Sequence, residues 1–405
     1  MVGSYETDRP NPVNEGLTTS AEDVSLLTFT TNIFGHLPRV DQRRWAHAYV
    51  TALLRTKGKK SIRRLADTIS PSPAATAQSL RQFVNLSPWD WRPVLHALTR
   101  WAEGHGPVTA WSIGRALLPK RGEQSVGVHR HFDPSSGQTL NSQLGFGAFL
   151  HIGTAQVPVG WHLYMPHSWI DDPRLRRRTR VPDTEHYRSP WSHALGLVDA
   201  LAATSASSPV VADMSDDPDV RLFIQALNER RHTLVVAVPP HFKVIPGERS
   251  ATTASLLSAK TCLSSGTVRD VIVAEPDGAQ RRTRVLSAPV RLPHFRPSSA
   301  PERPHQLFAE CGPGSRLGPV WISTLPERRL SDAASLTALA TSTTSTITAM
   351  ARCFGLLDFE GRSFPGWHHH MALVSTAYAF QRLGRSRSPM PPRLGASEPD
   401  QRASA

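Results

Sequence analysis

The fold is decided by the stretch WSHALGLVDALAATSASSPVVADMSDDPDVRLFIQALNERRHTLVVAVP, residues 191–239. Apolar residues recur at helical spacing in WSHALGLVDALAAT and in DVRLFIQALNERR, which predicts two amphipathic helices. PVVAD (209–213) and HTLVVAVP (232–239) are short apolar runs of the kind that form buried strands. The stretch therefore predicts helices alternating with strands, which is typical of a sheet covered by helices.

Three further strands are predicted upstream of this stretch. The runs at 143–153 and 157–166 flank a Thr-Ala-Gln turn and predict a β-hairpin. Before them, TAWSIGRALLPKRG (109–122) predicts a strand at 109–113 that ends in a tight basic turn. The predicted order is strand, strand, strand, helix, strand, helix, strand. This order predicts a mixed α/β domain with a ribonuclease H-like sheet, whose strand ends are positions that can carry chemistry.

Helical patterns fill residues 23–105. RRWAHAYVTALL, KKSIRRLADTI with Ser61 as its N-cap, and TAQSLRQFVNLSPWDW predict three short helices. Two interpretations are open: a helix-turn-helix-like DNA-binding module, and an ordinary helical bundle with a solvated basic face. The candidate DNA contacts of this region are Lys57, Lys59, Lys60, Arg63 and Arg64.

The remaining segments complete the predicted domain organisation. Residues 241–327 are less regular, with strands expected at VIVAE and VWISTLP, and are predicted to be a subdomain inserted into the sheet domain. The sheet domain itself comprises 106–240 and 328–385, and ends in two helical segments. Residues 1–22 and 386–405 are rich in Pro, Ser, Asp and Arg and are predicted to be disordered tails.

Composition narrows the class of partner. Lys and Arg number 46 against 33 Asp and Glu, which gives a net charge of +13 and a pI of about 10.4. A polyanion such as double-stranded DNA accounts for this excess, and a basic protein with no such partner is the alternative. The three cysteines form no Cys-x-x-Cys pair, so neither a disulfide framework nor a zinc site is expected. The N-terminus is polar and no apolar run approaches the ~18 residues of a membrane span, so we expect a soluble cytoplasmic, nucleoid-associated protein without an export signal.

The order and spacing of several pieces resemble the insertion-sequence transposases of the DDE superfamily endonuclease type. The resemblance runs from about 34 to 383 and includes DQRRWAHAYVTALL, KKSIRRLAD, LRQFVNLSPWDW, NSQLGFGAFLHIG, VGWHLYMPHSW, PVVAD, VWISTLP and FEGRSFPGWHHHMALVSTAYAF. It implies a ribonuclease H-like catalytic domain in which two Asp and one Glu hold two divalent metal ions. Such ions clamp the attacking and leaving oxygens when DNA is cleaved and joined.

The chain departs from this family pattern at two of the three acidic positions. Gly114 and Arg115 stand where the family has two consecutive Asp residues, and a guanidinium is always charged and offers no acceptor to a metal. Asp213, at the end of PVVAD, stands at the second acidic position, although a turn or N-cap aspartate is the alternative. The family's Glu position, counted back from Gly355-Leu356, falls on Thr344.

Three consecutive histidines and a second group of basic residues are further candidates for functional roles. Consecutive helix residues are about 100° apart, so His368, His369 and His370 do not converge on one ion, and we expect structural roles for them. RLRRRTR is predicted to be a surface loop. The additional candidate phosphate contacts are Lys120, Arg121, Arg174, Arg176, Arg177, Arg178 and Arg180.

Together these observations predict a transposase-family protein that binds DNA, has lost catalysis and serves a domesticated, regulatory role. No cofactor is expected, and Mg²⁺ is needed only if catalysis is retained. Two alternatives remain open: a functional transposase with unusual metal ligands, and a scaffold without DNA contact or a decaying element. Homo-oligomerisation is compatible with each of these.

Overall fold

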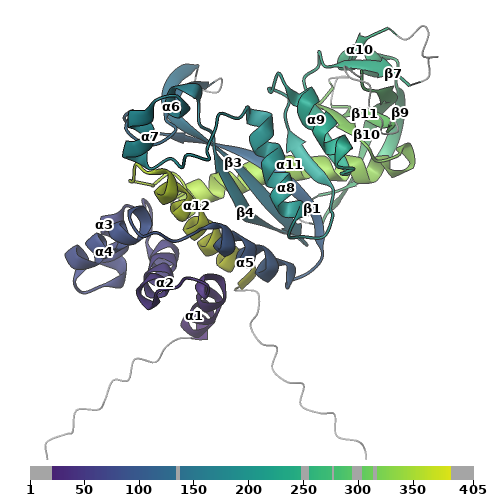
Figure 1. Ribbon diagram of the computed structural model, residues 1–405. Helices are drawn as coiled ribbons and strands as arrows, with labels where there is room; N and C mark the ends of the chain where they lie inside the picture. The colour runs from purple at the N-terminus through teal and green to yellow at the C-terminus, as the bar shows by residue number, and fades with distance from the viewer. Residues whose placement is uncertain are drawn as a thin grey trace, which may run out of the picture.

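The computed structural model describes residues 21–133, 137–247, 255–275, 278–293, 303–312 and 317–384. A large mixed sheet lies at its centre, with helices on both faces and a layer of N-terminal helices on one side (Figure 1). The predicted tails lie outside the described residues, except that Ala21 and Glu22 begin the first helix. None of the helices in the described ranges has the length and apolar character that a membrane crossing requires.

The N-terminal layer contains α1 (Ala21–Phe34), α2 (Val40–Arg55), α3 (Ile62–Ile69), α4 (Pro73–Asn85) and α5 (Arg92–Glu103). The helices predicted here are confirmed as α2, α3 and α4. The side chain of Ser61 accepts a hydrogen bond from the backbone N–H of Arg64 and caps α3, as expected. Pro73 begins α4, at a position where no backbone donor is needed.

The core strands are β1 (Val108–Pro119), β3 (Gln138–Ile152), β4 (Ala155–Leu163), β5 (Val210–Asp213) and β6 (Leu234–Val238). They lie in the order β4-β3-β1-β5-β6, with antiparallel pairing among the first three and parallel pairing from β1 through β5 to β6. β2 (His129–Asp133) pairs with the outer part of β3. α8 (Pro190–Ala202) and α9 (Val220–Glu229) precede β5 and β6, respectively. This is the ribonuclease H-like mixed sheet that was predicted.

β1 is longer than the sequence indicated. A strand ending at Ile113 was predicted, but the pairing with β3 continues from Gly114 opposite Gly147 to Pro119 opposite Ser142. The glycine and arginine after Ile113 were interpreted as a turn, and this was wrong because β3 supplies hydrogen-bond partners along the whole length of β1. Gly114 and Arg115 therefore lie in the middle of a strand.

Two long helices complete the core, and they confirm the predicted C-terminal helical region. α11 (Leu330–Cys353) lies across one face of the sheet and contacts β1, β5 and β6. α12 (Phe364–Ala379) lies between the N-terminal layer and β4, where it contacts α2, α4 and α5 (Figure 1). Nearly all side chains of α12 are buried, so this helix joins the two layers into one core.

The region between β6 and β12 (Val320–Ser323) is more regular than predicted. It contains β7 (Lys243–Pro246), β8 (Leu257–Ser258), α10 (Ala259–Ser264), β9 (Thr267–Ala274), β10 (Gln280–Arg291) and β11 (His305–Glu310). Strands were expected only at VIVAE and VWISTLP, which correspond to parts of β9 and β12. Because β12 pairs with both β6 and β11, the hydrogen-bonded sheet continues from the core into this region.

Candidate functional site

β1, β5 and α11 converge in the middle of the sheet, at the C-terminal end of β5. Ile113 pairs in parallel with Ala212, so the residues that follow them, Gly114 and Asp213, are neighbours on adjacent strands. α11 crosses this point, and the side chain of Thr343 lies over Gly114. The fold thus brings together the three segments in which the resemblance places the acidic residues.

Gly114 has no room for a side chain. A Cβ atom at this position would lie 2.5 Å from Cγ2 of Thr343 and 2.9 Å from Cδ1 of Ile347. Non-bonded carbon atoms pack best at roughly 3.5–4.0 Å, so even an alanine would require the side chains of Thr343 and Ile347 to move. The side chains of α11 occupy the space into which a carboxylate from residue 114 would project.

Arg115 alternates to the opposite face of β1. Its guanidinium forms an ion pair with Asp216, in the turn that follows β5. The neighbouring Asp217 is buried, and this burial raises the pKa of its carboxyl. Arg115 therefore neutralises an acidic turn, a role that its residue type allows and metal binding does not.

Asp213 is the last residue of β5 and is exposed. Its Oδ1 accepts hydrogen bonds from the backbone N–H of Ser215 at 3.0 Å and from the Ser215 hydroxyl at 2.7 Å. An aspartate bonded to the backbone two residues further on is typical of a turn. This is the alternative that the sequence left open for Asp213, and its part as the surviving metal ligand stays a prediction.

α11 presents Thr343 to the sheet, while Thr344 is exposed. Oγ1 of Thr343 lies 2.6 Å from Oγ of Ser112 on β1 and accepts a hydrogen bond of 2.6 Å from Nε2 of Gln156 on β4. The hydroxyl of Thr346 donates to Oε1 of Gln156 at 2.7 Å. A buried polar network thus holds α11 against β1 and β4. Its members are far apart in the chain and form no local motif, so the sequence did not indicate it.

The resemblance implies a two-metal centre built from three acidic residues. Mg²⁺ requires oxygen ligands in near-octahedral geometry, and paired ions need several carboxylates. Of the positions that the resemblance assigns, Asp213 alone carries a carboxylate, and Arg115 places a cation on the adjacent strand. In the part of the chain that the structure describes, no group of three His, Cys, Asp or Glu side chains is arranged to hold a metal ion.

The basic candidates of the N-terminal layer divide into exposed and buried residues. Lys60 is only 3 % exposed, its ammonium donates a hydrogen bond to the carbonyl of Thr56, and burial lowers its pKa. Lys60 does not project with its neighbours, which corrects that part of the prediction, while its contact with DNA stays a prediction. The exposed candidates are Lys57, Lys59, Arg63 and Arg64.

Lys120 and Arg121 follow β1, and they also differ in how exposed their side chains are. The ammonium of Lys120 donates a hydrogen bond of 3.0 Å to the carbonyl of Phe359 and lies 5.7 Å from the centroid of its ring. Burial lowers the pKa of Lys120 to about 8. Arg121 is exposed, so it is the accessible member of the pair.

The arginine run RLRRRTR forms a helix, which corrects the predicted surface loop. It makes up most of α7 (Pro173–Thr179), which follows the short α6 (His167–Ile170). Asp172 caps α7 by accepting a hydrogen bond of 2.7 Å from the backbone N–H of Arg174. The prediction failed because Asp172 and Pro173 together form a helix start, and the charge run obscured that signal.

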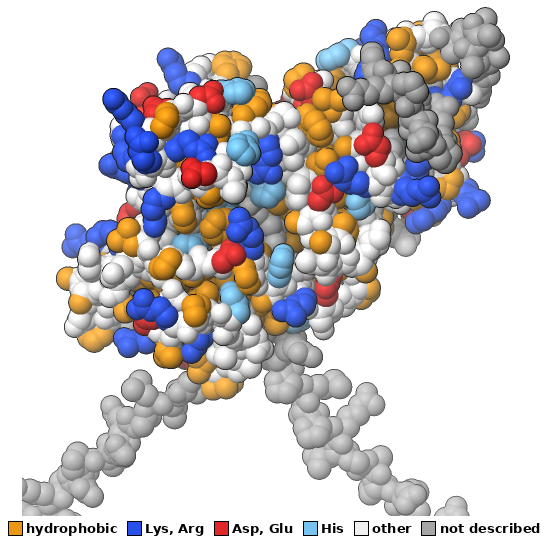
Figure 2. All heavy atoms as spheres, in the orientation of Figure 1, with side chains coloured by type: hydrophobic (Ala, Val, Ile, Leu, Met, Phe, Trp, Pro, Cys, Tyr) orange, Lys and Arg blue, Asp and Glu red, His pale blue; other side chains and the backbone are white. Residues whose placement is uncertain are grey.

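Within this run, the side chain of Arg176 is turned toward the protein and not toward solvent. Its guanidinium donates hydrogen bonds to three backbone carbonyls, those of Ile170 at 3.3 Å, Pro182 at 2.6 Å and Glu185 at 2.9 Å. The other arginines are exposed, and Figure 2 shows Lys and Arg side chains gathered over α7. These exposed residues are Arg174, Arg177, Arg178 and Arg180.

The three consecutive histidines of α12 are buried and face different partners. Burial lowers the pKa of His368 to about 3, and those of His369 and His370 to about 4. Their ring nitrogens lie within hydrogen-bond distance of the carbonyls of Phe364, of Val84 and Trp89, and of Gly355, respectively. His368 bonds within α12, whereas His369 and His370 connect α12 to other segments, so the three rings do not converge.

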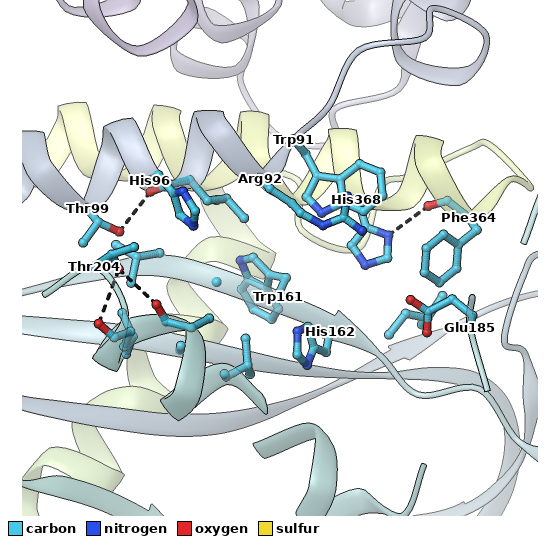
Figure 3. Close-up of a pocket in the computed structure, with 18 of the residues that line it drawn as sticks. Trp91, Arg92, His96, Thr99, Trp161, His162, Glu185, Thr204, Phe364 and His368 are labelled. Carbon is cyan, nitrogen blue, oxygen red and sulfur yellow. Dashed lines mark hydrogen bonds between the residues drawn. The ribbon is translucent and has the colours of Figure 1, made fainter. Parts of the chain in front are cut away.

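A separate cavity of about 210 Å³ lies between α5, α8, β4 and the start of α12 (Figure 3). Its walls are largely aromatic and apolar. Trp91 stacks on His368 there with ring centroids 4.4 Å apart, and Trp161 lies across the cavity from α5. None of the basic or acidic residues assigned from the sequence lines this cavity.

The order and direction of the core strands, β4-β3-β1-β5-β6, define a ribonuclease H-like fold. A family model described as DDE superfamily endonuclease matches residues 32–259, more than half of the chain, and the chain belongs to this family. The matched span includes α3, β1 and β5 and ends before α11.

No curated protein matches the chain. Among solved structures, the chain is similar to one described as "Cryo-EM structure of piggyBac transposase synaptic complex with hairpin DNA". The TM-score is 0.39 at 10 % sequence identity, and the alignment covers 91 % of this chain and 79 % of that chain.

Proposed function

We propose that this protein is a transposase-family protein that binds double-stranded DNA and does not cleave it by the two-metal mechanism. The observation that carries the proposal is the contact between β1 and α11. Thr343 and Ile347 fill the space that a carboxylate at residue 114 would need, and a hydrogen-bonded network holds Thr343 in place. A metal centre beside Gly114 would require these side chains to be displaced as well as further acidic residues.

Charge and family membership support the DNA-binding half of the proposal. The chain carries a net charge of +13, and it belongs to a family of endonucleases. Exposed cations lie on and before α3 and on α7, on the outer surface of the molecule (Figure 2). Lys and Arg side chains that contact phosphates release counterions, so the affinity falls steeply with salt and depends little on base sequence.

A protein that holds DNA without cutting it acts by occupying its site, which fits a regulatory role. The alternative, an active transposase with unusual ligands, needs other carboxylates beside Asp213. The nearest in the chain are Asp216, which is paired with Arg115, and Asp217, which is buried. A metal ion at Asp216 would replace its ion pair with Arg115, and Asp217 is buried, which supports the inactive form.

The test uses the purified full chain in two assays. A gel-shift titration with a labelled duplex, at low and at physiological salt, measures binding. Incubation of supercoiled plasmid with Mg²⁺ or Mn²⁺ measures nicking, and the Asp213→Asn variant is the matched control. We expect a salt-sensitive shift and no metal-dependent nicking by either protein.

Each half of the proposal has its own contrary result. Metal-dependent nicking by the natural chain that disappears in the Asp213→Asn variant would overturn the inactive assignment. Failure to shift duplex DNA even at low ionic strength would overturn DNA binding and leave the scaffold alternative.

A further inference from the structure

α3 and α4 have the dimensions of a helix-turn-helix pair. α3 is 8 residues long, α4 is 13, and residues 70–72 form the whole connection between them. The two helices pack against one another, and α2 packs against both. A short helix, a turn of three or four residues and a second helix is the arrangement in which the second helix enters the major groove of DNA.

The exposed face of α4 carries side chains suited to base recognition. The residues of its buried face are Thr76, Leu80, Phe83 and Val84. The exposed residues, which form one stripe along the opposite face, are Ala74, Ala75, Gln78, Arg81 and Gln82. Arginine pairs with guanine, glutamine with adenine, and an alanine methyl with the thymine methyl. α4 contains no acidic residue that would repel the phosphates on either side of a groove.

The C-terminal end of α4 is anchored to the core of the molecule. At its C-terminal end, the carbonyl of Val84 lies 2.8 Å from Nδ1 of His369 on the buried helix α12. α3 and α4 lie together at the periphery of the molecule (Figure 1). In helix-turn-helix proteins the N-terminal residues of the second helix make the base contacts. The fold therefore holds the C-terminal end of α4 against α12. The exposed residues of its first turns lie at the surface.

We propose that α4 is a recognition helix, which reads base edges in the major groove through Ala74, Ala75 and Gln78 in its first two turns and through Arg81 on the following turn of the same stripe. The exposed cations of α3 and the preceding turn, such as Lys59 and Arg63, contact the flanking phosphates. This assignment rests on the proposed DNA binding and adds sequence preference to it. The charge pattern of the sequence drew attention to the lysines and arginines, whereas the base-reading residues are recognised only from which face of α4 is exposed.

The experiment selects preferred duplexes from a random library with the full chain. The affinities for the selected duplex and for a scrambled one are then compared by fluorescence anisotropy. Arg81→Ala and Gln78→Ala remove base contacts, Lys59→Ala removes a phosphate contact, and Arg328→Ala, an exposed charge far from α4 in the chain, is the matched control. Thermal unfolding verifies that all variants are folded.

We expect Arg81→Ala and Gln78→Ala each to lower the ratio of specific to scrambled affinity by roughly 5- to 150-fold. Lys59→Ala should weaken both affinities equally, and Arg328→Ala should change neither ratio nor preference. If both α4 variants keep the ratio of specific to scrambled affinity, α4 does not recognise the bases. Binding by the natural chain without any sequence preference would also refute the recognition helix, but it would leave the proposed function intact. If the natural chain binds no duplex at all, both proposals are refuted.

Discussion

Gly114 on β1 and Thr343 on α11 are packed so closely that a Cβ atom on Gly114 would lie 2.5 Å from Cγ2 of Thr343. The same threonine is bonded through Oγ1 to Ser112 and Gln156. The glycine is therefore the residue that permits α11 to approach β1, and the polar network holds the helix there. An ordinary substitution at residue 114 disturbs both.

The first prediction concerns this contact. Gly114→Ala should lower the free energy of unfolding by about 1–3 kcal/mol, because it overpacks the interface. Thr343→Ser removes the opposing methyl and keeps the hydroxyl, so Gly114→Ala should cost less in that background. Urea denaturation of the four proteins in the cycle measures the coupling. Strictly additive effects would contradict a direct contact between the two residues.

The second prediction uses two adjacent lysines as a matched pair. Lys59 is exposed, so Lys59→Ala should weaken DNA binding, reduce the salt slope by about 1 and change stability by less than about 0.5 kcal/mol. Lys60 is buried, so Lys60→Ala should lower stability by about 1–3 kcal/mol through lost packing and a lost hydrogen bond. Anisotropy and chemical denaturation separate the two effects. If Lys60→Ala weakened DNA binding and Lys59→Ala lowered stability, the described burial of the two side chains would be contradicted.

The third prediction compares neighbouring arginines on α7. Arg176→Ala should lower stability by about 1–3 kcal/mol, because three backbone carbonyls lose their donor. Faster proteolysis of the segment after α7 should accompany this loss. Arg177→Ala removes an equal charge from the surface and should lower DNA affinity without either effect. Equal protease sensitivity in both variants would argue against a structural role for Arg176.

The fourth prediction contrasts two buried histidines. Within the described residues, neither ring nitrogen of His193 has a hydrogen-bond partner, and its ring stacks on Phe146. His193→Phe should therefore leave stability unchanged or raise it. His369→Phe should cost about 1–3 kcal/mol, because a carbonyl of Val84 or Trp89 loses its donor. The midpoint of urea unfolding for each variant provides the comparison, and a loss for His193→Phe as large as that for His369→Phe would contradict it.

The fifth prediction is a loss of stability in mild acid. Burial lowers the pKa of His193 to about 2, whereas an unfolded histidine titrates near about 6.5. Between these values the unfolded chain binds a proton that the native chain does not, so stability falls as the pH falls below about 6.5. At pH 5 this histidine alone should account for about 2 kcal/mol. His193→Phe should therefore reduce the difference in unfolding free energy between pH 7 and pH 5, and an unchanged difference would refute the assignment.

The sequence by itself determined the elements whose signals are local. The apolar periodicity of 191–239 predicted α8, β5, α9 and β6, and the hairpin signals predicted β3 and β4. The family assignment was also contained in the sequence, whereas the loss of acidic residues at 114 and 344 stays a prediction from the resemblance. These features follow from side-chain spacing along one segment, which the sequence records directly.

Only the tertiary structure decided what surrounds those residues. It extended β1 through Gly114, placed Thr343 over that glycine, buried Lys60 beside exposed Lys59, and turned Arg176 toward three carbonyls. Each of these depends on contacts between groups distant in the chain, or on which face of a helix meets the core. Adjacent residues of one type therefore have different roles, because burial is a property of the packed molecule and not of the local sequence.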